Sequence, residues 1–260
     1  MRVITVASQK GGTGKTTTSS AISSWAAAHG TKALAIDLDP QGSLTCIMRG
    51  SGNAMSSYEL MKGTSAGQVI QSGAGEDMPD IIPANLQLAA ADAEYSTQPG
   101  RDFLLKKAIE PLHQRYDLVV IDTPPTLGTL LINALSAATE VIIPVQVDTF
   151  ALQSLYQLME TISQVREYCN NRLTVSGVLL TRYNGRTILT RDLREGLEQV
   201  CSDLGIPLFS TAISEGIATK EAQTLRKSLF TYAPKSKPAQ DYAALMGELK
   251  IGGCYIGKTV

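Results

Sequence analysis

The chain contains few of the residues that build metal clusters, disulfide frameworks or strongly charged surfaces. Its 260 residues include four cysteines and two histidines, and no two cysteines stand in a CxxC pair. This spacing excludes a local zinc or iron–sulfur motif and a disulfide framework, so we expect four reduced thiols. Charged residues make up 18% of the chain, and the formal net charge is −1. Any affinity for nucleic acid or membrane therefore requires a local patch.

Long apolar runs are also absent. No stretch approaches the roughly 18 residues of a membrane span, and the N-terminal MRVITVASQ is too short for the apolar core of a signal peptide. We therefore expect a cytoplasmic protein without membrane contact. The apolar fraction of 43% is typical of a globular protein. We expect a single domain over residues 1–250, followed by a short tail at 251–260.

Apolar runs alternate with segments of helical spacing along the chain. Buried strands are predicted at 3–7, 33–36, 118–121, 141–145, 173–180 and 208–213, with a shorter one at 80–83. Helices are predicted at 16–28, 101–112, 150–168, 189–204, 220–229 and 239–249. The polar stretch 50–75 is expected to hold surface loops and short helices. This alternation predicts an α/β fold with a mostly parallel central sheet covered by helices on both faces.

Polar motifs follow three of the predicted strands. SQKGGTGKT follows the strand at 3–7, DLDPQ follows the strand at 33–36, and DTPP follows the strand at 118–121. Ligands of such folds bind at the carboxyl ends of parallel strands. Because all three motifs fall at that edge, the sequence predicts a ligand site there.

The first motif has the composition of a phosphate-binding loop. Its glycines let successive backbone N–H groups converge on phosphate oxygens, Lys15 suits the β- and γ-phosphates, and the Thr16 hydroxyl suits Mg²⁺. The helix that follows directs its positive end at the phosphates. One position departs from the general pattern, because Gln9 stands where a glycine is expected, and Lys10 is an additional lysine. We expect the nucleotide phosphates to contact Lys10, Gly11, Gly12, Thr13, Gly14, Lys15, Thr16 and Thr17.

Four stretches together resemble a known family: KGGTGKTTT, LAIDLDPQGS, LVVIDTPP and PVQVDTFALQSL. They are similar to the motifs of the ParA/Soj branch of the deviant-Walker ATPases, a superfamily of P-loop ATPases that also contains MinD. The resemblance runs from about residue 2 to about residue 249, and DPQGS and PANLQLAAAD are closest to the ParA/Soj branch. It implies a three-layer P-loop NTPase fold, ATP and Mg²⁺ as ligands, and slow ATP hydrolysis.

The resemblance also gives the second lysine a role. In the family, two monomers pack face to face with ATP between them, and Lys10 would reach the phosphates bound by the other subunit while Lys15 serves its own. A cation supplied across the interface relieves the repulsion between two facing triphosphates only when both sites are filled, so ATP would switch the homodimer on. The alternative is that Lys10 is a solvated loop lysine.

Carboxylates end two neighbouring predicted strands, where they can hold the waters of Mg²⁺ or orient an attacking water. By resemblance, Asp122 is the Walker B aspartate and Asp39 positions or activates the hydrolytic water. With Thr16 they form the expected metal site, and Asp39, Lys10 and Lys15 form the expected catalytic set. Asp37 is expected to support the loop. The alternative is that these carboxylates only cap the ends of strands.

Several later residues are candidates by resemblance. Gln146 and Asp148 lie near the expected dimer interface, although a plain surface role is equally consistent with their sequence. Tyr183 and Asn184 fall where the family forms part of its adenine pocket. The sequence shows no arginine finger, so a partner that completes the site could control turnover.

ParA/Soj proteins, as ATP dimers, coat DNA without sequence preference, and a ParB-like partner triggers hydrolysis during plasmid or chromosome partition. Arg186 matches a family position used for DNA. Glu215 and Ala218, however, stand where arginines are common, and Lys220 is the only basic residue of that segment. Nonspecific binding needs a basic stripe that faces phosphates. The candidates are Arg182, Arg186, Arg191, Arg194, Lys220, Arg226, Lys227, Lys235 and Lys237, and the alternative is that these side chains are only solvated.

Three other classes of function compete with this one. A MinD-like membrane regulator would end in a basic amphipathic helix, which the tail GELKIGGCYIGKTV lacks. An enzyme like the nitrogenase iron protein would carry cysteines after the strands at 118–121 or 141–145, and none falls there. A ParA-like ATPase that positions a protein cargo stays open. Because the chain begins on the ATPase motifs, we expect no separate operator-binding domain.

Overall fold

The computed structural model describes residues 1–53, 55–75, 78–146, 148, 150–184 and 188–252, and for 188–193 it describes the backbone alone. The strands are β1 (Arg2–Val6), β2 (Ala33–Asp37), β3 (Asp80–Ile82), β4 (Leu118–Asp122), β5 (Glu140–Gln146), β6 (Thr174–Tyr183) and β7 (Leu208–Ser214). The longer helices are α1 (Lys15–Ala28), α7 (Thr129–Ala137), α8 (Ala151–Tyr168), α9 (Ile188–Asp203), α10 (Ile217–Thr224) and α12 (Lys237–Leu249). The shorter ones are α2 (Ser43–Ile47), α3 (Ser57–Met61), α4 (Ala66–Val69), α5 (Ala91–Glu94), α6 (Leu104–Ile109) and α11 (Leu229–Tyr232), with 3₁₀ turns η1 (Leu86–Ala90), η2 (Arg101–Phe103) and η3 (Glu110–Gln114).

Across the described residues, the seven strands form one sheet in the order β3-β2-β4-β1-β5-β6-β7. Every neighbouring pair is parallel. β1 lies at the centre, and the chain runs to β2 on one side of it and later crosses from β4 to β5 on the other. The strand order therefore reverses beside β1, which is where ligands bind in sheets of this kind. All seven predicted strands and the α/β class are confirmed.

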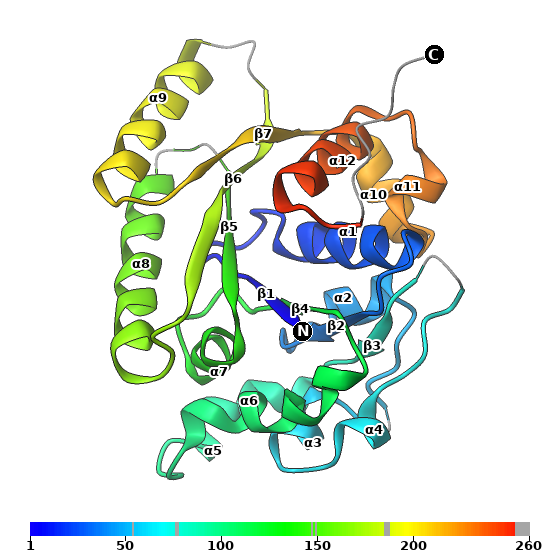
Figure 1. The fold of residues 1–260 in the computed structure, drawn as a ribbon. Coiled ribbons are helices and arrows are strands. Elements are labelled where there is room, and N and C mark those ends of the chain that lie inside the picture. Colours follow the sequence, from blue (N-terminus) through cyan, green and yellow to red (C-terminus); the bar gives the residue numbers. More distant parts are fainter. Residues whose placement is uncertain (54, 76–77, 147, 149, 185–187, 253–260) are drawn as a thin grey trace.

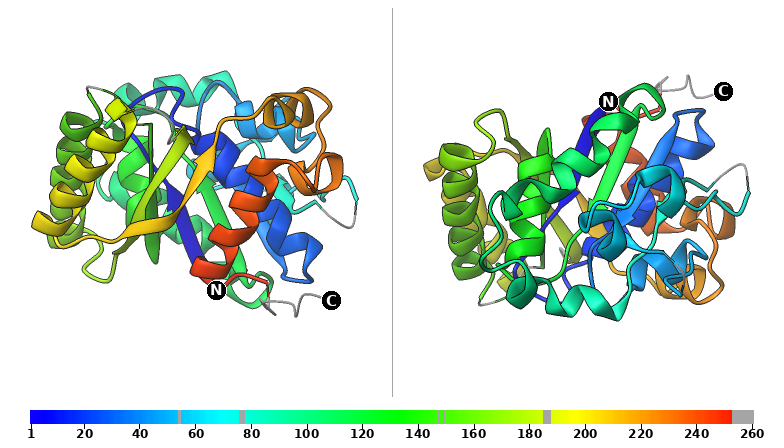
Figure 2. Two further views of the ribbon diagram at one scale, coloured as in Figure 1. Left: turned by 90° about the horizontal axis from the view of Figure 1, so that it is seen from above. Right: turned by 90° about the horizontal axis from the view of Figure 1, so that it is seen from below.

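Helices cover both faces of the sheet (Figures 1 and 2). On one face, α1, α10, α11 and α12 enclose a core with Ile4, Ile22, Tyr242 and Leu245. On the other face, α5 to α9 pack in two adjoining clusters over β2, β4, β5 and β6. Ile251, which the sequence analysis assigns to the tail, is 4% exposed and packs in the first of these cores.

The helices differ from expectation in three places. The predicted helix at 220–229 is wrong, because α10 ends at Thr224 and α11 begins only at Leu229, with Arg226 between them in the left-handed region (φ 52°). The predicted helix at 101–112 is broken into η2, α6 and η3. Helix α7 was not predicted, because its residues are almost all buried and leave no polar face that would mark an amphipathic helix.

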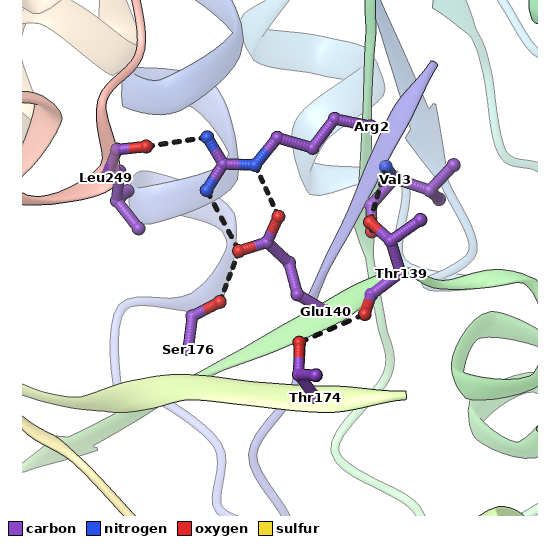
Figure 3. Close-up of polar contacts among 7 residues, drawn as sticks. All are labelled: Arg2, Val3, Thr139, Glu140, Thr174, Ser176 and Leu249. Carbon is purple, nitrogen blue, oxygen red and sulfur yellow. Dashed lines mark hydrogen bonds and ion pairs between the residues drawn. The ribbon is translucent and has the colours of Figure 1, made fainter. Parts of the chain in front are cut away.

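A polar cluster ties the amino ends of the central strands together (Figure 3). The Arg2 guanidinium forms an ion pair with Glu140 at the start of β5 and donates to the Leu249 carbonyl at 2.6 Å. The Ser176 hydroxyl on β6 donates to the same Glu140 carboxylate. This cluster fixes β1, β5, β6 and the end of α12 at the edge of the sheet opposite the three polar motifs.

Candidate functional site

The glycine-rich loop connects the carboxyl end of β1 to the start of α1. Gly12 and Gly14 adopt left-handed conformations, with φ of 79° and 84°, which residues with a Cβ rarely adopt. Gly14 directly precedes the first helical residue, Lys15, so the loop closes onto the amino end of α1. The Thr181 hydroxyl of β6 donates to the Thr13 carbonyl at 2.7 Å and holds the loop from the side. This backbone suits a phosphate group at the positive end of a helix.

Lys15 lies inside the site. Its side chain is 7% exposed, and its Nζ donates to the Lys10 carbonyl at 3.2 Å. Burial lowers the pKa of Lys15, against the opposing negative charges of Asp122 and Asp39. The structure therefore brings Lys15 together with both carboxylates expected at the metal.

Lys10 points elsewhere. Its ammonium group forms an ion pair with Asp148, and the two side chains are 37% and 26% exposed. Asp148 follows β5 and accepts the backbone N–H of Phe150 at 3.0 Å, just before α8. The second lysine of the loop is thus held at the surface beside the site, next to Asp148.

Asp37 and Asp122 are paired neighbours at the ends of β2 and β4, and both are fully buried. Burial raises the pKa of Asp122, and the charge of Asp37 adds to the effect; the Thr16 and Ser19 hydroxyls and Lys15 oppose it. Burial also raises the pKa of Asp37, although hydrogen bonds from Thr45 and from the Asp39 N–H oppose the shift. Asp37 thereby holds the segment that follows β2 through Asp39 and Thr45.

The Asp122 carboxylate is satisfied on one side only. Its Oδ1 accepts the Ser19 hydroxyl at 3.0 Å, whereas its buried Oδ2 has no hydrogen-bond partner among the described residues. A buried carboxylate oxygen without a donor is costly unless a cation or water completes it. The residues present therefore fit Mg²⁺, with the Thr16 hydroxyl beside the same carboxylate.

Asp39 lies two residues beyond the end of β2. It is half-buried, accepts the Gln41 N–H at 2.9 Å, and is close enough to Lys15 to act on its charge. No group of three or more His, Cys, Asp or Glu side chains that could hold a metal occurs in the described part of the chain. A metal ion here would thus take most of its ligands from phosphate oxygens and water, as Mg²⁺ does in nucleotide sites.

A pocket of about 180 Å³ opens beside the glycine loop. It is lined by the loop itself, by Thr181 and Arg182 at the end of β6, and by the segment from Ile213 to Gln223. Gln223 donates to the Thr17 hydroxyl at 2.9 Å and closes one wall. Tyr183 and Asn184 do not line it. Nothing in the sequence singles out Thr181 or Gln223, whose contacts to the loop join residues more than 160 positions apart.

The basic candidates are spread over several environments. Arg182 pairs with Glu215, Arg194 with Glu198, and Lys237 with Asp241. Arg186 lies outside the described residues, and nothing is described of the Arg191 side chain. Ala218 packs against the core instead of facing solvent. Among the candidates, Lys220, Arg226, Lys227 and Lys235 are exposed and form no ion pair with any described residue.

The chain is similar to known proteins over nearly its whole length. A family model described as an AAA domain matches residues 1–175. Sporulation initiation inhibitor protein Soj of Bacillus subtilis is 36% identical over 258 residues, covering 97% of this chain and 99% of that protein. Chromosome-partitioning ATPase Soj of Treponema pallidum is 31% identical, covering 95% of this chain and 96% of that protein. The chain belongs to the Soj/ParA family of AAA-domain ATPases.

A solved structure with a bound nucleotide is also similar to this Soj/ParA chain. The structure described as cobyrinic acid a,c-diamide synthase from Mycobacterium smegmatis, with bound ATP analog and magnesium, is 33% identical with a TM-score of 0.82. The alignment covers 97% of each chain. Among the described residues, no helix is long and apolar enough to pass through a lipid bilayer.

Proposed function

We propose that this Soj/ParA ATPase is an ATP-dependent dimerising switch that hydrolyses ATP slowly with Mg²⁺. The observation that carries the proposal is the division of labour between the two lysines. Lys15 is buried among Asp39 and Asp122, while the Lys10 ammonium group lies outside this cluster, on Asp148. A lysine held at the rim is placed to act on a second molecule that packs against this edge.

In this proposal the residues have distinct roles. The backbone of residues 11–17 and Lys15 hold the phosphates, and Thr16 and Asp122 hold Mg²⁺, which supplies charge neutralisation at the phosphates when bound. Asp39 positions the attacking water. Lys10 completes the site of the other subunit, so a monomer turns over slowly. The 180 Å³ pocket beside the loop accommodates the nucleoside, with Arg182 and Gln223 in its walls.

The test is the oligomeric state with ATP, with ADP and without nucleotide, measured by sedimentation. We expect the wild type to dimerise with ATP alone, Lys15→Ala to bind no nucleotide, and Lys10→Ala to bind ATP but stay monomeric. An ATP dimer of normal affinity in Lys10→Ala would contradict the role given to Lys10.

We further propose that the ATP dimer binds DNA without sequence preference and serves plasmid or chromosome partition on the nucleoid, with a ParB-like partner that stimulates hydrolysis. A pocket of about 470 Å³ supports the DNA contact, because Arg49, Arg226 and Lys227 line it together. The Arg49 Nε donates to the Arg226 carbonyl at 3.1 Å, and both residues adopt positive φ, 59° and 52°. Clustered basic side chains of this kind bind phosphates.

The relatives add to this support, since the name of one of them, a chromosome-partitioning ATPase, places its role in chromosome partition. Positioning of a protein cargo without DNA binding is the second candidate. It is favoured by the Arg182–Glu215 pair, which neutralises charge at a position where a basic side chain would serve DNA. DNA binding by the ATP dimer separates the two.

A further inference from the structure

The short helix α5 contacts both α3 and the start of α7. Its Asp92 carboxylate accepts the backbone N–H of Thr129 at 2.5 Å, and Thr129 is the first residue of α7. Helix α7 begins where the loop 123–128, which continues from Asp122, ends. Asp92 therefore satisfies one of the unpaired N–H groups at the start of α7 and places a negative charge at its positive end.

Gly128 shows how closely Asp92 sits against this loop. A Cβ at this position would lie 2.4 Å from Asp92 Oδ2 and 2.7 Å from Oδ1, and its three nearest atoms all belong to Asp92. The backbone of Gly128 is extended (φ −112°, ψ −167°), a conformation open to any residue. A methyl group at position 128 would therefore require the Asp92 carboxylate to move.

Glu94, at the end of α5, contacts α3. Glu94 accepts the Tyr58 hydroxyl at 2.9 Å and pairs with Lys62 at 3.0 Å, at the end of α3. At the start of α3, Ser57 donates to the Asp37 carbonyl at 2.6 Å. A continuous set of contacts therefore runs from the end of β2 through α3 and α5 to the start of α7.

Helix α5 is itself well anchored. Ala91 and Tyr95, on either side of the polar residues, are 0% and 3% exposed and pack with Leu130 and Ala134 of α7. The buried side of α5 thus fixes the position of α5 along α7. The carboxylate of Asp92 is thereby held against the amino end of α7. The loop 123–128 is anchored at its other end by the Thr123 hydroxyl, which donates to the Val6 carbonyl at 2.9 Å.

We propose that Asp92 is a positioning residue of the ATPase site. It acts through the loop 123–128, whose two ends are fixed by Thr123 and by the contact between Asp92 and Thr129. Pro124 and Pro125 stiffen the loop, so fixing its ends determines its course beside Asp122. The inference rests on the role proposed for Asp122 at the metal.

Removal of the carboxylate should affect turnover more than binding. In Asp92→Ala we expect kcat for ATP to fall roughly tenfold, since small displacements of catalytic groups are costly. The affinity for ADP should stay within about twofold, because residues 11–17 bind the phosphates. Asp92→Asn keeps an acceptor oxygen of the same reach and should restore most of kcat. Glu110→Gln, which removes an exposed carboxylate of η3 that takes no part in these contacts, is the control and should keep wild-type kcat.

A double-mutant cycle makes the test specific. Gly128→Ala should lower kcat like Asp92→Ala, because its methyl group displaces the carboxylate. In the Asp92→Ala background the same methyl group has room, so Gly128→Ala should cause no further loss. Additive losses, or a kcat of Asp92→Ala within about twofold of wild type, would overturn the proposal. The proposal would also be overturned if kcat of Asp92→Asn were no higher than kcat of Asp92→Ala. If Asp92→Ala does not fold, Asp92→Asn alone decides, and an Asp92→Asn protein that melts normally but is inactive would overturn the proposal.

Asp122→Asn, measured alongside, separates a failure of the proposed metal site from a failure of the positioning role of Asp92. Normal turnover in Asp122→Asn would remove the proposed metal site itself. An inactive Asp122→Asn with fully active Asp92→Ala and Gly128→Ala would leave that site standing and remove only the positioning role of Asp92.

Discussion

Lys10 and Asp148, 138 positions apart, form an ion pair on the surface of this chain. The pair holds the extra lysine of the phosphate loop against the segment that leads from β5 to α8. A lysine that serves a second subunit must first leave this carboxylate. If Lys10 acts on a second subunit as proposed, the contact between Lys10 and Asp148 favours the monomer and opposes dimerisation.

Loss of the Asp148 charge should make dimerisation easier. Asp148→Asn keeps the oxygen that accepts the Phe150 N–H and removes only the pairing with Lys10. Each partly exposed pair contributes up to about 1 kcal/mol, and two pairs, one in each subunit, are broken per dimer. The protein concentration for half-dimerisation with ATP should therefore fall by at most about thirtyfold. Sedimentation at several protein concentrations measures this. Weaker dimerisation in Asp148→Asn would mean that Asp148 itself contributes to the interface.

Ionisation of Asp122 should have opposite effects on stability and on ligand binding. Its folded pKa is raised, chiefly by burial, so the folded state holds a proton that the unfolded state has lost above about pH 4. Between about pH 4 and the raised pKa of Asp122, the free energy of unfolding without nucleotide should therefore fall as pH rises. Magnesium requires the ionised carboxylate, so the affinity for Mg-ADP should rise over the same range.

Urea unfolding and ADP titration between mildly acidic and mildly alkaline pH measure both effects. Asp122→Asn is the control, and its stability and affinity should depend less on pH than those of the wild type. Equal pH dependence in the two proteins would show that another group is responsible.

Stability away from the site should depend on Glu140. Burial raises the pKa of this carboxyl, but the hydrogen bonds from Arg2 and Ser176 outweigh it and hold the pKa below its usual value. The stabilisation is thus present above about pH 4.3 and lost as pH falls below it. Glu140→Gln should lower the free energy of unfolding by about 1–3 kcal/mol, as for hydrogen bonds to charged groups. The exposed Glu110→Gln should have no such effect, and ATP turnover should be unchanged in both variants.

The fold was predictable from sequence because its strands are fully buried. Parallel strands such as β2 and β4 read as uninterrupted apolar runs, and their boundaries follow within one or two residues. Helix α7 is also almost entirely buried, but its short apolar run does not distinguish a helix from a connecting segment. The break between α10 and α11 occurs at Arg226, which adopts a left-handed conformation. The sequence has no glycine there that would have indicated such a conformation.

The candidate site was predictable where it is local and not where it depends on distant residues. Lys15, Thr16 and the glycines belong to one contiguous motif. Asp122 follows from its place after a buried strand. Thr181, Gln223 and Asp92, however, reach the loops from 37 to 206 positions away. Only the packing of β6, α10 and α5 against these loops brings them there.

DNA binding should depend on the pocket formed by Arg49, Arg226 and Lys227. The double variant Arg226→Ala/Lys227→Ala should weaken binding of the ATP dimer to DNA of any sequence. The slope of log affinity against log salt should become shallower by about 1 for each phosphate that these side chains no longer neutralise. Lys106→Ala/Lys107→Ala, two exposed lysines on α6 at the other face of the sheet, is the matched control. An equal effect of both pairs would discard the pocket as the DNA contact.

The central claim is that ATP switches this chain into a DNA-binding dimer, and the Asp39→Ala protein tests it most directly. Loss of the carboxylate that we propose positions the water should trap the ATP state. Binding to mixed-sequence duplex DNA can then be measured at equilibrium with ATP, with ADP and without nucleotide, at two salt concentrations. We predict binding with ATP alone, weakened strongly by salt. An ATP dimer without DNA affinity would contradict the claim and favour an ATPase that positions a protein cargo.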